Sequence, residues 1–325
     1  MMLLLSILCA AKKLDVAHLN PIYNNCIQIY GEHQFTEVYS GYGDKQHYVS
    51  ARKLVCSRTS SYWLIKLATY IGLAKNSEER VTLLHRLGYF GVDSIEESTV
   101  ELTVNGKQRF FDSDDFGDVH ALTSEAPNTV SSPDASAPSY LINKPIMVIS
   151  DIDDTIKISN VSSVIPSIRK LFIEPFQFFS DIATRYAQWK DQASFVYLSG
   201  GFKQSYRFIQ PEIVKRFPDG PVILRPFKVS NNWGDGSTLN FKIKMGFELL
   251  TITSSRVVLI GDSTQKDAAA YAAIFKKFPG RICRIYIRLV LPSQLKNVSE
   301  ALQDLPQQII IIFTDASELP TKLVC

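Results

Sequence analysis

The residues best suited to chemistry are acidic side chains that follow short apolar runs. Asp151 and Asp153, two positions apart, follow the run Ile146–Ile149 after one serine. At the end of a strand, two carboxylates with this spacing can both face the space beyond the sheet edge. One can then attack a phosphorus atom while the other transfers the proton of the leaving group. Aspartates at strand ends also cap the following helix in many proteins, so this motif alone leaves both interpretations open.

A hydroxyl and two glycines follow another apolar run. Ser199, Gly200 and Gly201 come after Phe195–Leu198. Main-chain N–H groups can approach an anionic oxygen closely where no side chain intervenes, so this turn is suited to a phosphoryl group. A tight turn that only connects a strand to a helix has the same composition, and that alternative also stays open.

Two further carboxylates, Asp262 and Asp267, follow the run Val257–Ile260. Hard oxygen ligands of this kind suit Mg²⁺, which binds through one or two carboxylates together with a substrate phosphate. A cluster of like charges is unfavourable unless a cation or a shifted pKa compensates for it. Taken together, the three motifs predict a metal-assisted phosphoryl-transfer site.

Six apolar runs in the second half of the chain indicate the sheet that must position these groups. Val- and Ile-rich runs that alternate with helical patterns are typical of a parallel sheet buried on both faces. The carboxyl ends of parallel strands meet at one edge, where α/β proteins bind ligands. The runs are Ile146–Ile149, Phe195–Leu198, Val222–Leu224, Val257–Ile260, Ile282–Ile287 and Ile309–Phe313.

The first half of the chain predicts a small, mainly-β domain with a helical insertion. β-like runs occur at Cys26–Tyr30, Tyr39–Gly43 and Thr99–Val104, and an Asn-Gly hairpin turn follows the last of them. Between these runs, Tyr62–Leu87 has apolar residues at helical spacing. No catalytic constellation is found in this half.

Composition places the domain boundary in the Ser-, Ala- and Pro-rich stretch 124–143, which is interpreted as a linker. A β-rich domain over 12–123 and a phosphatase domain over 144–325 are therefore expected. Residues 1–11 resemble a short signal segment but lack a basic n-region, and they are too few to span a bilayer. Export to the periplasm or the outside therefore stays open beside a cytoplasmic or peripheral-membrane location. Cys26 and Cys56 can pair in an oxidising compartment.

The charge is distributed unevenly along the 325 residues. Residues 1–143 carry 12 basic and 16 acidic side chains (12 − 16 = −4), and residues 144–325 carry 23 and 16 (23 − 16 = +7). A basic second half suits an anionic substrate or an anionic membrane surface, and equally an ordinary solvated face. A hydrophobic content of 46% and a charged content of 21% are typical of a soluble globular protein. We expect no nucleic-acid partner.

In order and spacing, the motifs resemble those of the haloacid-dehalogenase superfamily, including its DxDxT motif. More narrowly, Val148–Lys157 and Leu259–Tyr271, with Phe278–Arg281 and Ile285–Arg288, are similar to the phosphatidate phosphatase family of the fungal actin-patch protein. The resemblance implies a haloacid-dehalogenase-like Rossmannoid sheet with helices on both faces. It also implies Mg²⁺-dependent hydrolysis of phosphatidate to diacylglycerol and phosphate through an aspartyl-phosphate intermediate.

The resemblance assigns catalytic roles residue by residue. Asp151 would be the nucleophile, and Asp153 would protonate the leaving alkoxide and then accept a proton from water. Ser199 would hydrogen-bond the phosphoryl oxygens. The lysine of the third motif best matches Lys242, with Lys244 as the alternative.

The resemblance also implies the metal and substrate ligands. Asp262 would hold Mg²⁺ together with Asp151 and the main-chain carbonyl of Asp153, and Asp267 would support the metal or the lysine. Thr155, Gly200 and Lys203 are the expected substrate contacts, although a lysine on a helix surface, such as Lys203, is more often solvated.

One departure from the family pattern bears on the substrate. Family members typically continue with Ser-x-Ser-Pro-Trp after the second strand, whereas this chain has Ser199 followed by Gly-Gly-Phe. The catalytic serine is retained but the Pro-Trp element is not. Two alternatives to a phosphatidate phosphatase therefore remain, namely a phosphomonoesterase for a soluble substrate and a non-catalytic lipid- or protein-binding module.

Overall fold

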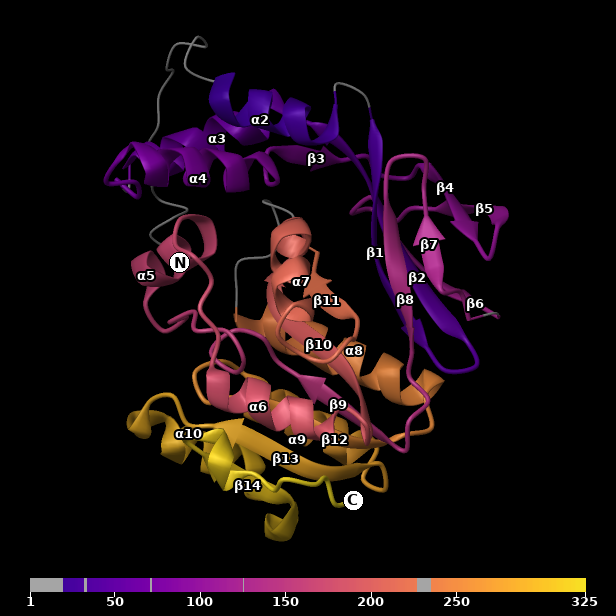
Figure 1. Ribbon diagram of the computed structural model, residues 1–325, viewed down its shortest axis with the longest axis vertical. Helices are drawn as coiled ribbons and strands as arrows, with labels where there is room; N and C mark the ends of the chain where they lie inside the picture. The colour runs from indigo at the N-terminus through magenta and orange to yellow at the C-terminus, as the bar shows by residue number, and fades with distance from the viewer. Residues whose placement is uncertain (1–19, 32–33, 71, 125, 227–234) are drawn as a thin grey trace.

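A computed structural model describes residues 20–31, 34–70, 72–124, 126–226 and 235–325. The signal-like segment expected at 1–11 lies outside these described residues. The described chain has two sheets, with the eight-stranded sheet and helices α2–α4 beside and above the second, six-stranded sheet (Figure 1). Among the described helices, none has both the length and the apolar character needed to cross a membrane.

The second half of the chain builds a six-stranded sheet in which every neighbouring pair is parallel, in the order β11-β10-β9-β12-β13-β14. All six apolar runs of the sequence are strands of this sheet, so the predicted parallel sheet is confirmed. The strands are β9 (Ile146–Ser150), β10 (Ala193–Phe202), β11 (Val222–Arg225), β12 (Arg256–Asp262), β13 (Ile282–Arg288) and β14 (Ile310–Phe313).

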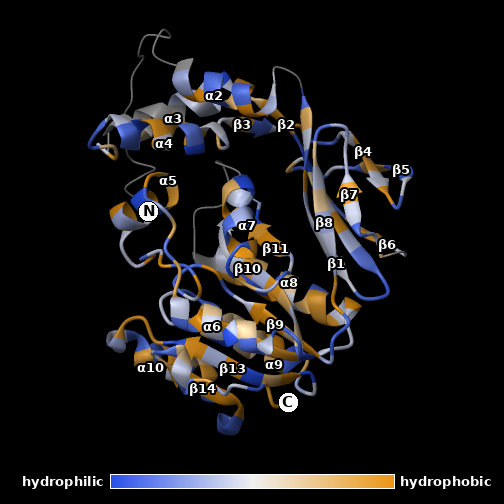
Figure 2. Cartoon of the chain, in the orientation of Figure 1, coloured by the Kyte–Doolittle hydropathy of each residue, from blue (hydrophilic) through white to orange (hydrophobic). Residues whose placement is uncertain are grey.

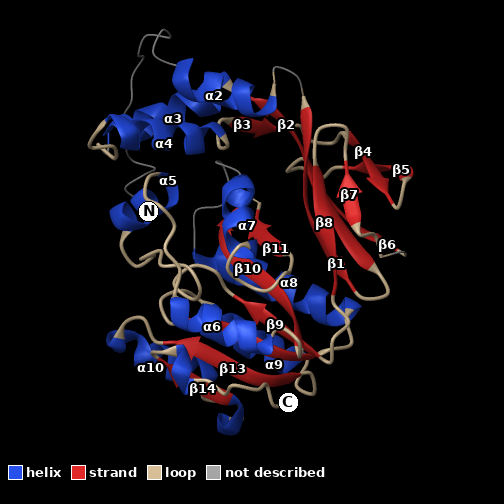
Figure 3. Ribbon diagram, in the orientation of Figure 1, coloured by secondary structure: helices blue, strands red, loops and turns tan. Residues whose placement is uncertain are grey.

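Helices cover both faces of this sheet, which confirms the α/β class (Figure 3). On one face, Val148 packs with residues of α6 and α7, and on the other face its neighbours Met147 and Ile149 pack with residues of α8, α9 and α10. Successive side chains of a strand point to opposite faces, so a strand covered on both sides must be apolar throughout. The helices are α5 (Val164–Phe172), α6 (Ser180–Trp189), α7 (Tyr206–Val214), α8 (Asp235–Ile252), α9 (Asp267–Lys277) and α10 (Leu295–Leu302).

The first half builds an eight-stranded sheet in the order β3-β2-β1-β8-β7-β4-β5, with β6 paired to β2. The predicted Asn-Gly hairpin joins β4 to β5, and both of its residues have positive φ (Asn105 53° and Gly106 73°), as a type I′ turn requires. The strands are β1 (Phe35–Gly43), β2 (His47–Cys56), β3 (Val92–Ser94), β4 (Thr99–Val104), β5 (Lys107–Asp112), β6 (Asp118–Thr123), β7 (Thr129–Ser131) and β8 (Ser136–Leu141).

Three helices accompany this sheet, namely α2 (Asn20–Tyr30), α3 (Arg58–Tyr70) and α4 (Ser77–Gly88). The helical pattern predicted over Tyr62–Leu87 is therefore confirmed as parts of two helices. The strand expected at Cys26–Tyr30 is wrong, because this segment ends α2. Ile22 and Cys26, four residues apart, are the fully buried positions, and that spacing places them on one helical face.

The interpretation of 124–143 as a linker is also wrong, because this stretch contains β7 and β8. Val130 and Ala137 are directly paired across these two strands and buried in the core of the sheet. β8 also pairs in parallel with β1, so the stretch lies within the sheet. Pro138 lies in β8 although proline has no N–H group to donate to a neighbouring strand. This proline and the many serines give the stretch the composition of a loop.

The two halves meet in a buried interface that contains polar pairs. The Tyr206 hydroxyl accepts a hydrogen bond from the Ser40 N–H at 3.0 Å and lies 2.6 Å from the Ser40 hydroxyl. Tyr39 of β1 belongs to the same hydrophobic cluster as Tyr206 of α7. The face of β1 and the start of α7 therefore form one packed interior.

Candidate active site

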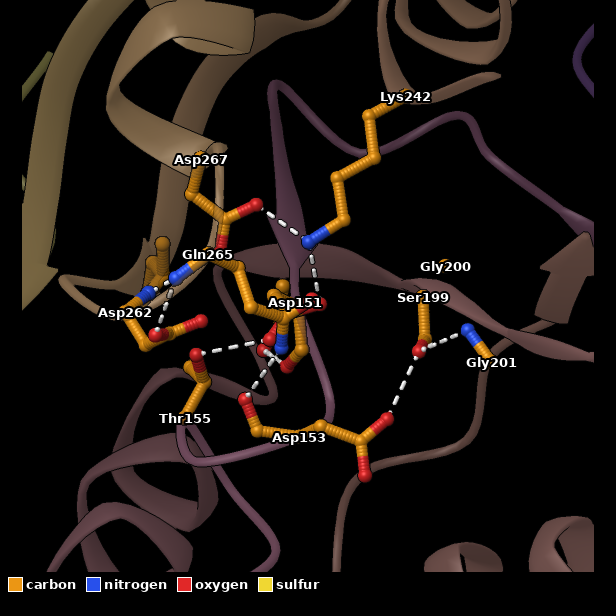
Figure 4. Close-up of polar contacts among 12 residues, drawn as sticks. Asp151, Asp153, Thr155, Ser199, Gly200, Gly201, Lys242, Asp262, Gln265 and Asp267 are labelled. Atoms are coloured by element: carbon orange, nitrogen blue, oxygen red, sulfur yellow. Dashed lines mark hydrogen bonds and ion pairs between the residues drawn. The ribbon is translucent and has the colours of Figure 1, made fainter. Parts of the chain in front are cut away.

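Asp151 is the first residue after β9, and it is buried (Figure 4). One carboxylate oxygen accepts a hydrogen bond from Lys242 Nζ at 2.7 Å, and the other accepts one from Thr155 Oγ1 at 3.1 Å. Burial raises the pKa of the Asp151 carboxyl well above its ordinary value, and Lys242 opposes that rise. The predicted nucleophile is thus held by two donors. Thr155, expected to contact substrate, is itself fully buried and fixes the orientation of Asp151.

Lys242, on α8, is the lysine of this site. Its Nζ lies between Asp151 and Asp267 and forms an ion pair with each. Burial lowers the pKa of Lys242, but the carboxylates of Asp151 and Asp267 raise it above its ordinary value, so the ammonium is retained. Lys244, two residues further along the same helix, is exposed. The structure therefore separates the two lysines that the sequence left as alternatives.

Three carboxylates converge at the ends of β9 and β12. Oxygens of Asp151, Asp262 and Asp267 lie within 4.8 Å of one another, and all three residues are buried. Burial, followed by the neighbouring Asp267 charge, raises the pKa of Asp262 to about 8. We call these three residues the acidic triad. Like charges at this separation are stabilised by a cation, and Lys242 is one such cation already in place.

The triad fits a divalent metal ion. Oδ1 of Asp262 accepts the N–H of Gln265 at 3.1 Å, whereas Oδ2 is buried without a hydrogen-bond partner among the described residues. A buried carboxylate oxygen with no donor is costly, and a cation removes that cost. Three hard oxygen donors, one of them unpartnered, are the donor set that Mg²⁺ or Ca²⁺ takes.

The carboxylate of Asp153 points away from the acidic triad. Its oxygens accept hydrogen bonds from Lys157 Nζ at 2.6 Å, Ser159 Oγ at 2.5 Å and Ser199 Oγ at 3.0 Å. Burial alone would raise the pKa of Asp153, but Lys157 and these hydrogen bonds outweigh it and lower the pKa to about 2. The Asp153 main-chain oxygen faces the triad side, where it accepts a hydrogen bond from Gln265 Nε2 at 3.2 Å. Only this carbonyl oxygen is thus placed to join a metal site with Asp262.

Lys157, Ser159 and Gln265 are site residues that the sequence motifs did not single out. Lys157 and Ser159 lie four and six residues after Asp153, so local spacing was an available signal for them. Gln265 lies between Asp262 and Asp267, on the loop that enters α9. Its contact with Asp153 joins two loops that are far apart in the chain, and no local pattern could have indicated it.

Ser199 lies in β10, at the point where that strand's pairing with β11 becomes irregular. Its hydroxyl donates to Asp153 and accepts the Gly201 N–H at 2.9 Å. A Cβ on Gly200 would come within 2.4 Å of Thr238 Cγ2, so glycine is required there by the packing of α8. The predicted serine and glycines therefore do lie beside Asp153.

Lys203, expected as a substrate contact, is not at the site. Its side chain is buried, and Nζ forms a 2.8 Å ion pair with Asp118 and a 3.2 Å hydrogen bond with Ser50. Nζ also lies 4.6 Å from the centre of the Tyr39 ring. The expectation is wrong because the first half of the chain supplies a buried carboxylate that the sequence around Lys203 does not reveal.

Comparison with known proteins adds to this geometry. Residues 146–289 match the family model of the phosphatidate phosphatase APP1 catalytic domain. Over 152 residues the chain is 33% identical to phosphatidate phosphatase APP1 of Saccharomyces cerevisiae. That alignment covers 44% of this chain and 26% of the yeast protein, so the match spans about a quarter of that relative. The matched segment contains the acidic triad, Asp153, Ser199 and Lys242. Residues 146–289 of this chain are therefore similar to the phosphatidate phosphatase APP1 catalytic domain.

Proposed function

We propose that this protein is a Mg²⁺-dependent phosphatase that hydrolyses phosphatidate to diacylglycerol and phosphate through a phosphorylated Asp151. The observation that carries the proposal is the buried Asp151 carboxylate, held by Lys242 and Thr155 beside the unpartnered oxygen of Asp262. The family of the matched segment supports phosphatidate as the substrate. The parallel sheet, with Asp151 at the end of its inner strand β9, supports a haloacid-dehalogenase-like fold for 144–325, preceded by the β-rich part.

In this proposal, Asp151 attacks the phosphorus atom with one carboxylate oxygen, while Lys242 and Thr155, which donate to different oxygens of that carboxylate, hold its orientation. Because the pKa of Lys242 is raised, the ammonium stays charged and opposes the rise that burial causes in the pKa of the nucleophile Asp151. Mg²⁺, held by Asp151, Asp262 and the Asp153 carbonyl with support from Asp267, would neutralise charge on the phosphoryl oxygens. Positioning and charge neutralisation are the main demands of phosphoryl transfer, and these residues meet both.

Asp153 is ionised in this arrangement, because its pKa is about 2. It is therefore ready to accept a proton from the water that hydrolyses the aspartyl-phosphate. To donate a proton to the leaving alkoxide it must first exchange its contacts with Lys157 and Ser159 for the substrate oxygen and take up a proton from solvent, because the ionised carboxylate has none to give. Ser199, which now donates to Asp153, would turn its hydroxyl to the phosphoryl group in the same exchange.

Phosphate release tests the proposal. Phosphatidate in mixed micelles and a panel of sugar phosphates are offered to the wild type, with Mg²⁺ and after chelation. We expect Mg²⁺-dependent release from phosphatidate and a fall of kcat by roughly 10³ or more in Asp151→Asn, while the exposed Asp304→Asn serves as the matched control. Release from sugar phosphates alone would identify a phosphomonoesterase for soluble substrates, and no release from any of them would identify a non-catalytic module.

The covalent step has its own test. With phosphatidate that carries a labelled phosphate, an acid-quenched reaction should leave label on the peptide that contains Asp151, and hydroxylamine should remove it. Label on no peptide, at a time when turnover is under way, would reject the aspartyl-phosphate while leaving the hydrolase activity in place.

A further inference from the structure

Helix α5 places two large apolar side chains in water at its first turn. Val164 and Ile165 are 48% and 54% exposed, and no residue of α5 is fully buried. Further along the same helix, Ile168 and Phe172 pack against a cluster that contains Leu83 of α4. Figure 2 shows hydrophobic residues recurring along α5. The apolar stripe of α5 is therefore covered at its C-terminal end and uncovered at its N-terminal end.

The uncovered end of α5 is tied directly to the candidate active site. The carboxylate of Asp154 accepts the main-chain N–H groups of Ser159 at 2.7 Å and Val161 at 2.8 Å. Ser159 also donates to Asp153, so the loop that enters α5 is held at both carboxylates. Val164 follows Val161 by only three residues, so the exposed apolar pair lies a few residues from the acid/base group.

A cationic groove adjoins the other end of α5. It has a volume of about 460 Å³ and is lined by phenylalanine, proline and four charged residues, Arg86, Arg207, Arg216 and Glu212. Arg207 pairs with the buried Glu37 and Arg216 with Glu212, so three arginines face two carboxylates and the groove keeps an excess of one positive charge. Arg86 Nη1 donates to the carbonyl oxygens of Leu171 and Glu174 at 2.9 Å each, at the end of α5. We call this the arginine groove.

The arginine groove also borders the candidate active site. Phe176 lines it, and the Phe176 ring lies 5.5 Å from Nζ of Lys157, which pairs with Asp153. The guanidinium of Arg86 lies over the same ring at 4.5 Å. The Phe176 ring thus contacts two cations. One is Arg86 of the arginine groove, and the other is Lys157, which pairs with the Asp153 carboxylate.

We propose that α5 and the arginine groove together dock the protein on an anionic phospholipid bilayer. Apolar side chains beside cationic ones are the combination that binds the interface of such a membrane, the former entering the acyl boundary and the latter facing anionic headgroups. A second copy of this chain is a poorer occupant, because a symmetric contact would oppose two surfaces with the same excess of positive charge. This inference rests on the proposed function in one respect: if the protein is a phosphatidate phosphatase, its substrate is a lipid of the bilayer to which it docks.

Vesicle sedimentation tests the docking directly, without any lipid substrate. Vesicles of phosphatidylcholine, with and without phosphatidylglycerol, are mixed with the whole protein. We expect binding to the anionic vesicles that weakens as salt is raised. Ile165→Glu should lower the apparent affinity at least about 10-fold, because a large apolar contact is replaced by a charge that the anionic surface repels. Arg216→Glu should weaken binding and flatten its salt dependence.

Val324→Glu is the matched control, since Val324 is an apolar residue that is 62% exposed and lies outside α5 and the groove. Its vesicle binding should equal that of the wild type, and thermal melts of all variants establish that they are folded. Equal binding by Ile165→Glu and wild type would overturn the proposal, as would equal binding to neutral and anionic vesicles. Self-association would instead be identified if the wild type did not bind vesicles and its molecular mass rose with protein concentration, and if Ile165→Glu abolished that rise.

Activity separates this inference from the proposed function. For Ile165→Glu, the ratio of hydrolysis of vesicle phosphatidate to that of a water-soluble, short-chain phosphatidate should fall about 10-fold. Vesicle binding without hydrolysis of either substrate would reject the phosphatase and retain the docking surface. Unchanged hydrolysis of both substrates in Ile165→Glu would reject the docking surface and retain the phosphatase.

Discussion

The buried ion pair between Lys203 and Asp118 joins the catalytic half to the β-rich half, and it makes a sharp prediction for stability. The side chains are 10% and 5% exposed, and Nζ lies 2.8 Å from Oδ1. The other oxygen of Asp118 is buried without a hydrogen-bond partner among the described residues. In Lys203→Met, the Asp118 carboxyl would therefore lose its 2.8 Å partner.

We expect Lys203→Met to lower the free energy of unfolding by about 3–5 kcal/mol, the range for removing one partner of a buried pair. Asp118→Asn should also be destabilising. The double variant should cost less than the sum of the two single variants by about 1–3 kcal/mol, because the second change removes the charge that the first leaves unpaired. Urea unfolding followed by tryptophan fluorescence measures these values, and the fully buried Trp189 reports on the catalytic half.

The matched control is the pair of Lys276 and Asp304, whose nitrogen–oxygen distance is 3.4 Å and whose side chains are 63% and 69% exposed. Lys276→Met should change the unfolding free energy by no more than about 1 kcal/mol, as for other exposed pairs. The reasoning would be refuted if Lys203→Met cost no more than Lys276→Met, or if the double-variant cycle gave no coupling. Either result would mean that water reaches the Lys203 pair.

Three further predictions concern the site and the β-rich half. Gly261→Ala should lower kcat by about 10–100-fold, because the new Cβ would lie 2.5 Å from Oδ2 of the buried Asp267 and displace that carboxylate from Lys242. Phosphate release measures this change. Gly280→Ala, which has open space around it, should leave kcat unchanged in the same assay. Lys242→Met should lower kcat by roughly 10³ or more, because it removes the cation between two triad carboxylates, whereas the exposed Lys244→Met should leave the rate in the same assay near that of wild type. Loss of the disulfide between Cys26 and Cys56, which closes a 30-residue separation, should lower the unfolding free energy by about 3.5 kcal/mol. Urea unfolding of the wild type and of the variant with both cysteines replaced by serine measures this without reductant, so that the second disulfide, between Cys283 and Cys325, stays intact in both; equal unfolding free energies would contradict it.

The parallel sheet could be predicted because its signal is local. Each strand is a continuous apolar run, and a run such as Val257–Ile260 is apolar because both faces of β12 are covered. The positions of Asp151 and Asp262 at strand ends follow from the same runs. Their convergence then needs only the rule that parallel strands end at one edge.

What the sequence could not show depends on contacts between distant segments. Nothing near Lys203 indicates that Asp118, 85 residues earlier, will neutralise it. The stretch 124–143 has a loop-like composition, and only its pairing with β1 and β4 makes it a sheet segment. The five residues Cys26–Tyr30 are too few to distinguish a strand from a helix, whereas burial over Pro21–Tyr30 has helical spacing, with Ile22 and Cys26 buried.

The shared interior of the two halves has a consequence for how this protein can be divided. A fragment that began at Lys144 would expose the Tyr206 surface, would leave Lys203 without its carboxylate, and would remove the Tyr42 and His120 contacts of Glu248. Such a fragment would hold every proposed catalytic group and still lack part of its own packing. The matched segment, residues 146–289, thus lacks side chains that complete its own interior.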